Sequence, residues 1–186
     1  MGNWSSLLKL PLRDPHSFDS LVLPHLNAGY NLARWLLHDD SSAEDAVQEA
    51  ATRALRYFDS LRGTDARNWF LSIVRNTCFT HLRKSSTAME QTGLEDSEIE
   101  FFQASMNEVS PNPSQLLNRT RESTWVNAAI RCLPPPLREV IVLRELEELD
   151  YADIAKVAGI PIGTVMSRLS RARARLRVAL AERGID

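Results

Sequence analysis

The stretch from Asp150 to Leu180 constrains the fold most, because it predicts two helices joined by a tight turn. It runs DYADIAKVAGIPIGTVMSRLSRARARLRVAL. A small Ala155 stands where the two helices would cross, and Gly159 stands in the turn. Pro161 follows where the second helix would open, a position at which its missing N–H costs nothing because the first helical amides have no partner. This pattern is typical of a helix-turn-helix.

The second of these helices has an apolar stripe and an opposite face suited to a DNA groove. The stripe consists of Val165, Leu169, Ala172 and Leu176. The opposite face consists of Gly163, Ser167, Ser170, Arg171 and Ala174, with Arg168, Arg175, Arg173 and Arg177 on its two flanks. Small and polar residues between arginines favour a helix in the major groove, with base edges at the centre and phosphates at the flanks. The alternative is an amphipathic surface helix with solvated arginines.

Charge and composition divide the chain into three parts. The net charge of the 186 residues is −2, but residues 1–84 carry +1, residues 85–118 carry −6 and residues 119–186 carry +3. The middle part therefore has the composition of a linker. The two cysteines, Cys78 and Cys132, have no CxxC neighbour and suggest neither a disulfide framework nor a zinc site. No run of apolar residues reaches transmembrane length, and the start of the chain does not resemble a signal peptide.

These observations predict an all-α protein of two small helical domains joined by a flexible acidic linker, because no alternating strand pattern occurs anywhere. The expected divisions are an N-terminal extension at 1–17, a first helical domain at 18–84, the linker at 85–118 and a second helical domain at 119–186. The helix-turn-helix falls at about 151–171 of the second domain.

The run DDSSAEDAVQEAATRALRYF predicts a helix in the first domain, capped by Ser41 with Glu44 three residues later. Its inward residues would be Ala43, Ala46, Val47, Ala50, Ala54 and Phe58. Its outer stripe would be Asp45, Gln48, Glu49 and Thr52. Such a stripe is by default a solvated surface, and a protein docking face is the alternative.

From Arg53 to Lys84 the chain mixes cations with aromatic rings. Seven basic residues stand against two acidic ones, and a turn is expected at Arg62, Gly63, Thr64 and Asp65. The interleaved aromatics are Tyr57, Phe58, Trp69, Phe70 and Phe79. Cations that follow a phosphate backbone and rings that stack on bases suit single-stranded nucleic acid. The alternative is that most of these rings, Phe58 and Phe70 among them, form the core of a three-helix bundle.

Together these parts resemble a bacterial sigma factor of the extracytoplasmic-function (ECF) group, which has only regions 2 and 4 of the sigma-70 family. The resemblance rests on AEDAVQEA (43–50), the RG turn (62–63), WFLSIVRN (69–76), LPPPLREVIVLRELEELDYADIA (133–155) and GIPIGTVMSRLSRARARLR (159–177). These segments stand in the expected order and together make up about one third of the chain.

The resemblance implies three sets of contacts. Asp45, Gln48, Glu49 and Thr52 would bind the coiled coil of the polymerase β′ subunit, and the second domain would contact the β flap. Arg62, Gly63, Thr64, Asp65 and Ala66 would surround a base extruded from the minus-10 element, with Arg75 and Asn76 below it and the Asn76 amide directed toward the turn. The residues implied for the duplex minus-35 element are Gly163, Thr164, Met166, Ser167, Arg168, Ser170, Arg171, Arg173 and Arg175.

Two positions depart from the pattern of the family. Met166 stands where a basic residue is frequent, and Ser170 stands where some members carry an aromatic residue. The base preferences of the family at the minus-35 element are therefore not transferred to this chain.

The motifs indicate a promoter-recognition factor rather than an enzyme. There is no GxSxG, HExxH or GxxxxGK motif, and the four histidines lie at unrelated spacings, so no cofactor or metal is expected. A sigma factor in the bacterial cytoplasm, with an anti-sigma factor as partner and no membrane insertion, is the leading hypothesis. The alternatives are a regulator that binds only duplex DNA and a sigma mimic that titrates an anti-sigma factor.

Overall fold

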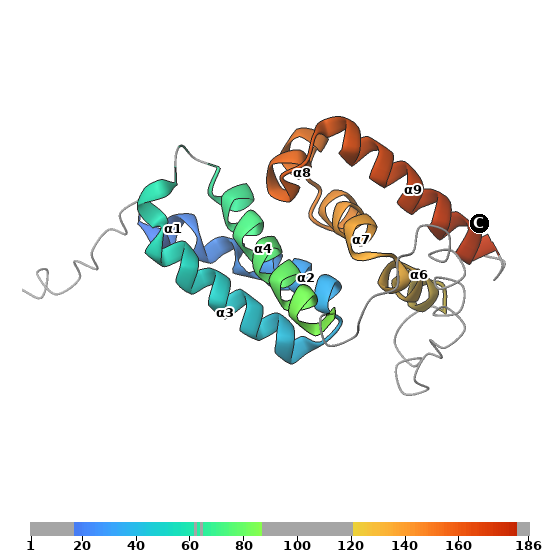
Figure 1. Ribbon diagram of the computed structural model, residues 1–186, viewed down its shortest axis with the longest axis horizontal. Helices are drawn as coiled ribbons and strands as arrows, with labels where there is room; N and C mark the ends of the chain where they lie inside the picture. Colours follow the sequence, from blue (N-terminus) through green and yellow to red (C-terminus); the bar gives the residue numbers. More distant parts are fainter. Residues whose placement is uncertain (1–16, 62, 64, 87–120, 182–186) are drawn as a thin grey trace, which may run out of the picture.

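The computed structural model describes residues 17–61, 63, 65–86 and 121–181, and every regular element within these ranges is a helix. The all-α fold expected from the sequence is confirmed. Two groups of helices lie side by side (Figure 1). The first group comprises α1 (Phe18–Leu21), η2 (Leu23–His25), α2 (Leu26–Leu37), α3 (Asp40–Arg56), η3 (Phe58–Ser60) and α4 (Ala66–Ser86). The second comprises α6 (Arg121–Cys132), α7 (Pro135–Ile141), the π-helical turn η5 (Val142–Leu146), α8 (Tyr151–Ala158) and α9 (Ile162–Ala181).

In the first group, α3 packs on α2 and α4 through a face of small side chains. Its alanines at positions 43, 46, 50 and 54 are fully buried, as the sequence predicted. Alanine loses no side-chain entropy on burial and lets helix axes come close. Phe70 of α4 is fully buried in the same core, and Phe58 packs edge-on against Phe18 with ring centroids 5.6 Å apart. These two rings therefore belong to the hydrophobic packing of the first group.

Gly29 allows α2 and α4 to meet closely. A Cβ atom at this position would lie 2.8 Å from Cε1 of Phe70, closer than real Cβ contacts allow. Any larger residue here would force the buried ring of Phe70 to move, so the contact between these two helices depends on glycine.

The start of α3 differs from the expected cap at Ser41. The N-cap is Asp39, whose Oδ2 accepts a hydrogen bond of 2.7 Å from the backbone N–H of Ser42. This hydrogen bond lowers the pKa of the Asp39 carboxyl group. The reason is that α2 ends on a left-handed residue, His38 with φ of 64°, which leaves Asp39 extended and in place to cap. Ser41 consequently lies inside the first turn of α3.

In the second group, α8 and α9 form the helix-turn-helix that the sequence predicted. Asp150 caps α8, and Gly159 ends it with a φ of 66°, which glycine adopts without strain. The carbonyl of Pro161 accepts hydrogen bonds from the N–H groups of Thr164 and Val165 at the start of α9. In the apolar stripe of α9, the residues at 165, 169 and 172 are buried, Leu176 is partly buried and Ala179 extends the stripe.

The two groups also contact each other, with α4 against α8 and α2 against α7 (Figure 1). Arg138 of α7 is central to this contact and only 5% exposed. Its guanidinium donates hydrogen bonds to the carbonyl of Leu133 at 2.8 Å and to the carbonyl of Trp35, at the end of α2, at 3.0 Å. It also contacts the carbonyl of Leu36 and the ring of His38. Arg138 therefore satisfies carbonyl groups of both helix groups at once.

Replacing Arg138 by methionine is expected to lower the free energy of unfolding by about 2 kcal/mol, because buried carbonyls would lose charge-assisted hydrogen bonds while the apolar volume is kept. Chemical denaturation of the full chain measures this. The control is Arg131→Met, since Arg131 is exposed and surface substitutions change stability by about 0.5 kcal/mol or less. Equal denaturation midpoints for the two variants would contradict the role given to Arg138.

Candidate functional site

The face of α9 opposite its buried stripe is open to solvent. Gly163, Met166, Ser167, Ser170, Arg171, Arg173 and Ala174 are all exposed. Thr164 and Arg175 are partly buried. The arrangement matches the small and polar centre with arginines around it that the sequence predicted. Apart from Met166 and the arginines, the exposed side chains of this face are small.

Arg168 differs from its expected place on the flank. Its side chain is partly buried, and Nη1 lies 3.8 Å from Oε2 of Glu139, a fully buried residue of α7. The guanidinium of Arg75 on α4 donates to Oε1 of the same carboxylate at 2.6 Å. Burial raises the pKa of Glu139, and the two guanidiniums oppose that shift. Glu139 thus pairs with one arginine of α4 and one of α9, the two helices for which the sequence predicted DNA contacts.

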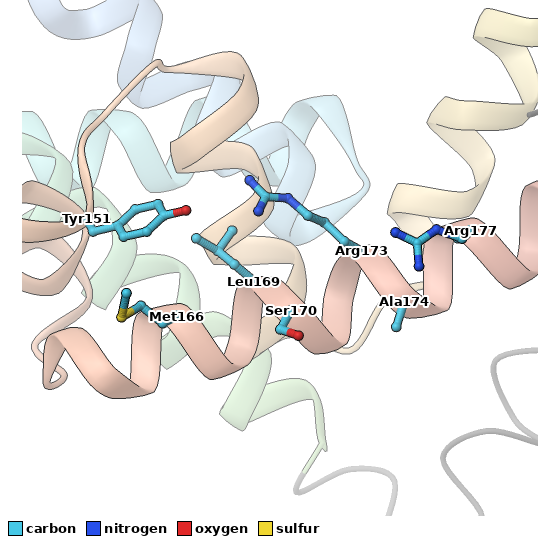
Figure 2. A pocket seen from close by; sticks show the side chains of 7 residues that line it. All are labelled: Tyr151, Met166, Leu169, Ser170, Arg173, Ala174 and Arg177. Carbon is cyan, nitrogen blue, oxygen red and sulfur yellow. The ribbon is translucent and has the colours of Figure 1, made fainter.

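A hollow lies beside the open face of α9 (Figure 2). It is lined by Tyr151, Met166, Leu169, Ser170, Arg173, Ala174 and Arg177. Within it, Nη2 of Arg173 forms an ion pair of 2.8 Å with Glu145. The hydrogen bond to Glu145 is the main cause that raises the pKa of the Arg173 guanidinium, and a hydrogen bond with Tyr151 adds to it. The cation is therefore held at the edge of the face rather than over its centre.

On α3, the outer stripe at positions 45, 48, 49 and 52 contains three exposed residues and one that pairs with other side chains of the protein. Asp45, Gln48 and Thr52 are exposed. Glu49 instead pairs with Arg53 at 2.5 Å and with Nε2 of His81 on α4 at 3.0 Å. The hydrogen bond with His81 is the main cause that lowers the pKa of Glu49. Asp45 and Gln48 are therefore the members of the stripe best placed to meet another molecule.

At the turn before α4, Gly63 has a φ of 81° and nothing lies within 4 Å of the position of an added Cβ. Arg62 and Thr64 lie outside the described residues. Asp65 is exposed, whereas Ala66 is only 2% exposed and anchors the first turn of α4 in the core. Gly63 thus has a left-handed conformation that glycine adopts without strain, and the exposed Asp65 follows two residues later.

Asn68, a residue that the sequence pattern did not indicate, contacts Asp65 after this turn. Its Nδ2 donates to Oδ2 of Asp65 at 3.0 Å, and its backbone N–H lies 3.4 Å from the other carboxylate oxygen. The spacing of Asp65 and Asn68, typical of a helix cap, was the available signal. Arg67, also missed, forms an ion pair of 2.9 Å with Glu147 of the second group.

Asn76 does not direct its amide toward the turn, contrary to the orientation expected from the sequence. It is exposed, and its Oδ1 accepts a hydrogen bond of 3.1 Å from Nη1 of the adjacent Arg75. Ten residues of helix separate it from Ala66, which corresponds to about 15 Å along the axis of α4. Asn76 and Arg75 therefore form a second polar position on α4, distinct from the turn.

The described residues offer little else that is chemically reactive. They contain no group of three or more His, Cys, Asp or Glu side chains arranged to hold a metal ion. Burial raises the pKa of the Cys78 thiol to about 12, so this group stays protonated at neutral pH. None of the described helices combines the length and apolar character needed to cross a membrane.

Known proteins resemble this chain over most of its length. The family Sigma-70 region 2 matches residues 21–87, and Sigma-70 region 4 matches residues 123–176. The RNA polymerase sigma-H factor of Pseudomonas aeruginosa is 34% identical over 170 residues, which cover 90% of this chain and 88% of the relative. The ECF RNA polymerase sigma-E factor of Escherichia coli K12 is 33% identical over 175 residues, which cover 92% of this chain and 85% of the relative.

The fold is similar to that of a solved sigma factor as well. The structure of RpoE in complex with the anti-sigma factor NepR from Bartonella quintana matches with a TM-score of 0.67 and 28% sequence identity, over 88% of this chain and 96% of that one. The chain therefore belongs to the sigma-70 family of RNA polymerase sigma factors.

Its relatives place it in the ECF group of that family. Like other members, it binds core RNA polymerase and promoter DNA and directs transcription from specific promoters. Sigma factors as a family are not enzymes.

Proposed function

We propose that this chain recognises the minus-35 element of its promoters as duplex DNA through α9. The open face of this helix carries the proposal, because its small and polar centre admits base edges. Arg171 lies on this face and is exposed. Arg171 is the candidate for reading a guanine, and the remaining arginines of the helix are candidates for binding phosphates.

The unpaired strand of the minus-10 element is assigned to the turn around Gly63 and to α4. Arg62, Gly63, Thr64, Asp65 and Ala66 are proposed to surround an extruded base. Asp65 supports this assignment, because it is exposed and lies beside the turn, where the buried amide of Asn68 donates to its carboxylate at 3.0 Å. Arg75 and Asn76 are assigned to the strand farther along α4, where the exposed amide has a cation next to it.

Promoter opening would require the two helix groups to separate. Lys156 of α8 lies 3.6 Å from Asp65, and Arg67 donates to the backbone carbonyl of Glu147 at 2.8 Å. The pKa of Asp153 on α8 is lowered first by its bond to Lys156 and also by a hydrogen bond from Asn68. A DNA strand entering the turn would compete with these contacts, so the packed arrangement is assigned to the protein before it binds a promoter.

The exposed stripe of α3 is proposed to bind the β′ coiled coil, and the second helix group to bind the β flap. An anti-sigma factor is proposed as a further partner, since RpoE of Bartonella quintana was solved in complex with one. The proposed place of action is the bacterial cytoplasm, with no cofactor.

Run-off transcription with purified core polymerase tests this function against its two alternatives. The chain is expected to direct specific transcripts from linear promoter DNA. A regulator that binds only duplex DNA would bind the promoter but yield no transcript with core polymerase. A sigma mimic would neither bind the promoter nor direct transcription. Failure to obtain any specific transcript from promoters selected for binding would contradict the proposal.

A further inference from the structure

Met166 is an exposed apolar side chain on the face of α9 proposed to enter the groove. It is 53% exposed and lies between the small residues Gly163 and Ser170, one turn to either side. An added Cβ at Gly163 would meet nothing within 4 Å. Figure 2 shows Met166 and Ser170 on successive turns of α9, and both line the hollow. A ligand lying on this part of the helix would therefore contact the methionine side chain.

The first six residues of α9, 162–167, carry no charged side chain. Ser167 uses its hydroxyl to donate to the carbonyl of Thr164 at 3.0 Å, which occupies the hydroxyl proton. Base edges are contacted mainly by the N-terminal part of the second helix of a helix-turn-helix. In this chain, that part offers Ile162 and Met166 as its large exposed side chains, and both are apolar.

An apolar side chain can distinguish bases in the major groove through one group only. The C5-methyl group of thymine is the apolar feature there, whereas the other base edges present hydrogen-bond donors and acceptors. Methionine suits such a contact, because its unbranched side chain is flexible and its sulfur is polarisable.

We propose that Met166 is a specificity-determining residue that reads a thymine of the minus-35 element through contact with the C5-methyl group of that base. The inference rests on the proposed function, in which α9 lies in the major groove. It assigns to this chain a preference for thymine at a position where a basic side chain would favour guanine or phosphate.

The test replaces thymine by deoxyuridine, which lacks only the methyl group. Promoter duplexes selected by the wild-type holoenzyme are synthesised with one thymine of the minus-35 element replaced at a time. Wild-type holoenzyme is expected to lose about fourfold in affinity at one position, the effect of a single methyl group removed from an apolar contact. Met166→Ala is expected to bind the thymine and deoxyuridine duplexes equally at that position, and Met166→Leu to retain most of the discrimination.

Val178→Ala is the matched control. Val178 is 54% exposed on the same helix, but lies twelve residues farther along, about 18 Å away. The ratio of the affinities of Val178→Ala for the thymine and deoxyuridine duplexes is expected to equal that of the wild type. Full tolerance of deoxyuridine at every position by the wild type would overturn the inference. The inference would also be overturned if Met166→Ala kept the wild-type ratio of affinities for the thymine and deoxyuridine duplexes. The same holds if this substitution weakened only the binding of core polymerase or another protein.

Arg171→Ala separates this inference from the proposed function. If this variant changes the preferred minus-35 sequence while deoxyuridine has no effect, α9 reads the duplex and only the role of Met166 is wrong. If neither Arg171→Ala nor a scrambled minus-35 sequence changes affinity, α9 does not read the duplex, and the proposed function of this helix fails with the inference.

Discussion

Replacing Asp45 and Gln48 of α3 by lysine is expected to weaken binding of core RNA polymerase by about a hundredfold or more. Both side chains are exposed, so the substitutions introduce positive charge where the proposed contact with the β′ coiled coil forms. If the partner surface is complementary to the acidic stripe, it is positively charged there, and opposing like charges across an interface cost several kcal/mol. Helix content and the denaturation midpoint are expected to stay nearly unchanged, because surface substitutions seldom alter stability. Equilibrium binding to purified core polymerase measures the effect.

Glu49 is left unchanged in this variant because the structure gives it an internal role. It binds Arg53 on its own helix and His81 on α4, so reversing its charge would disturb the first helix group as well as any interface. The control is Glu44→Lys, an exposed carboxylate of α3 outside the proposed stripe. If the double variant binds core polymerase as tightly as Glu44→Lys does, the stripe is an ordinary solvated surface.

Features set by short-range periodicity were predictable from the sequence. The stripe of α9 and the alanine face of α3 repeat every three or four residues, and both are buried as expected. The turn at Gly159 was equally local, because glycine adopts a positive φ at the end of a helix without strain. These elements depend on neighbours within a few residues, so their pattern is visible in one short stretch of sequence.

The start of α3 was not predictable in this way. Ser41 and Glu44 have the spacing of a capping box, but the left-handed His38 at the end of α2 brings Asp39 into the capping position first. The competing cap depends on how the preceding helix ends. A local motif alone does not contain that information.

The surroundings of Arg75 and Arg168 were unpredictable for a different reason. Both cations approach Glu139, and Arg75 and Glu139 lie 64 positions apart in the chain. The sequence shows that these residues are charged, but which charges meet depends on how α4 packs beside α7 and α8. Asn76 instead accepts from the adjacent Arg75, because ten residues of helix separate it from the start of α4 at the turn.

We propose that α4 helps to open the minus-10 region. Asn76→Ala is expected to leave core binding and closed-complex formation intact, because the side chain is exposed and contributes little to the core. Loss of an amide that binds an unpaired base is expected to reduce open complex on linear promoter DNA by about tenfold or more. A template with a premelted minus-10 bubble is expected to restore much of the transcription, because the cost of unpairing is removed in advance.

Permanganate reactivity of minus-10 thymines in the holoenzyme complex measures opening directly. With wild-type protein, these thymines are expected to become reactive on linear promoter DNA. With Asn76→Ala, they are expected to stay protected on linear DNA, while run-off product returns on the bubble template. Equal permanganate reactivity of the linear promoter with the variant and the wild type would contradict the role of α4 in strand opening.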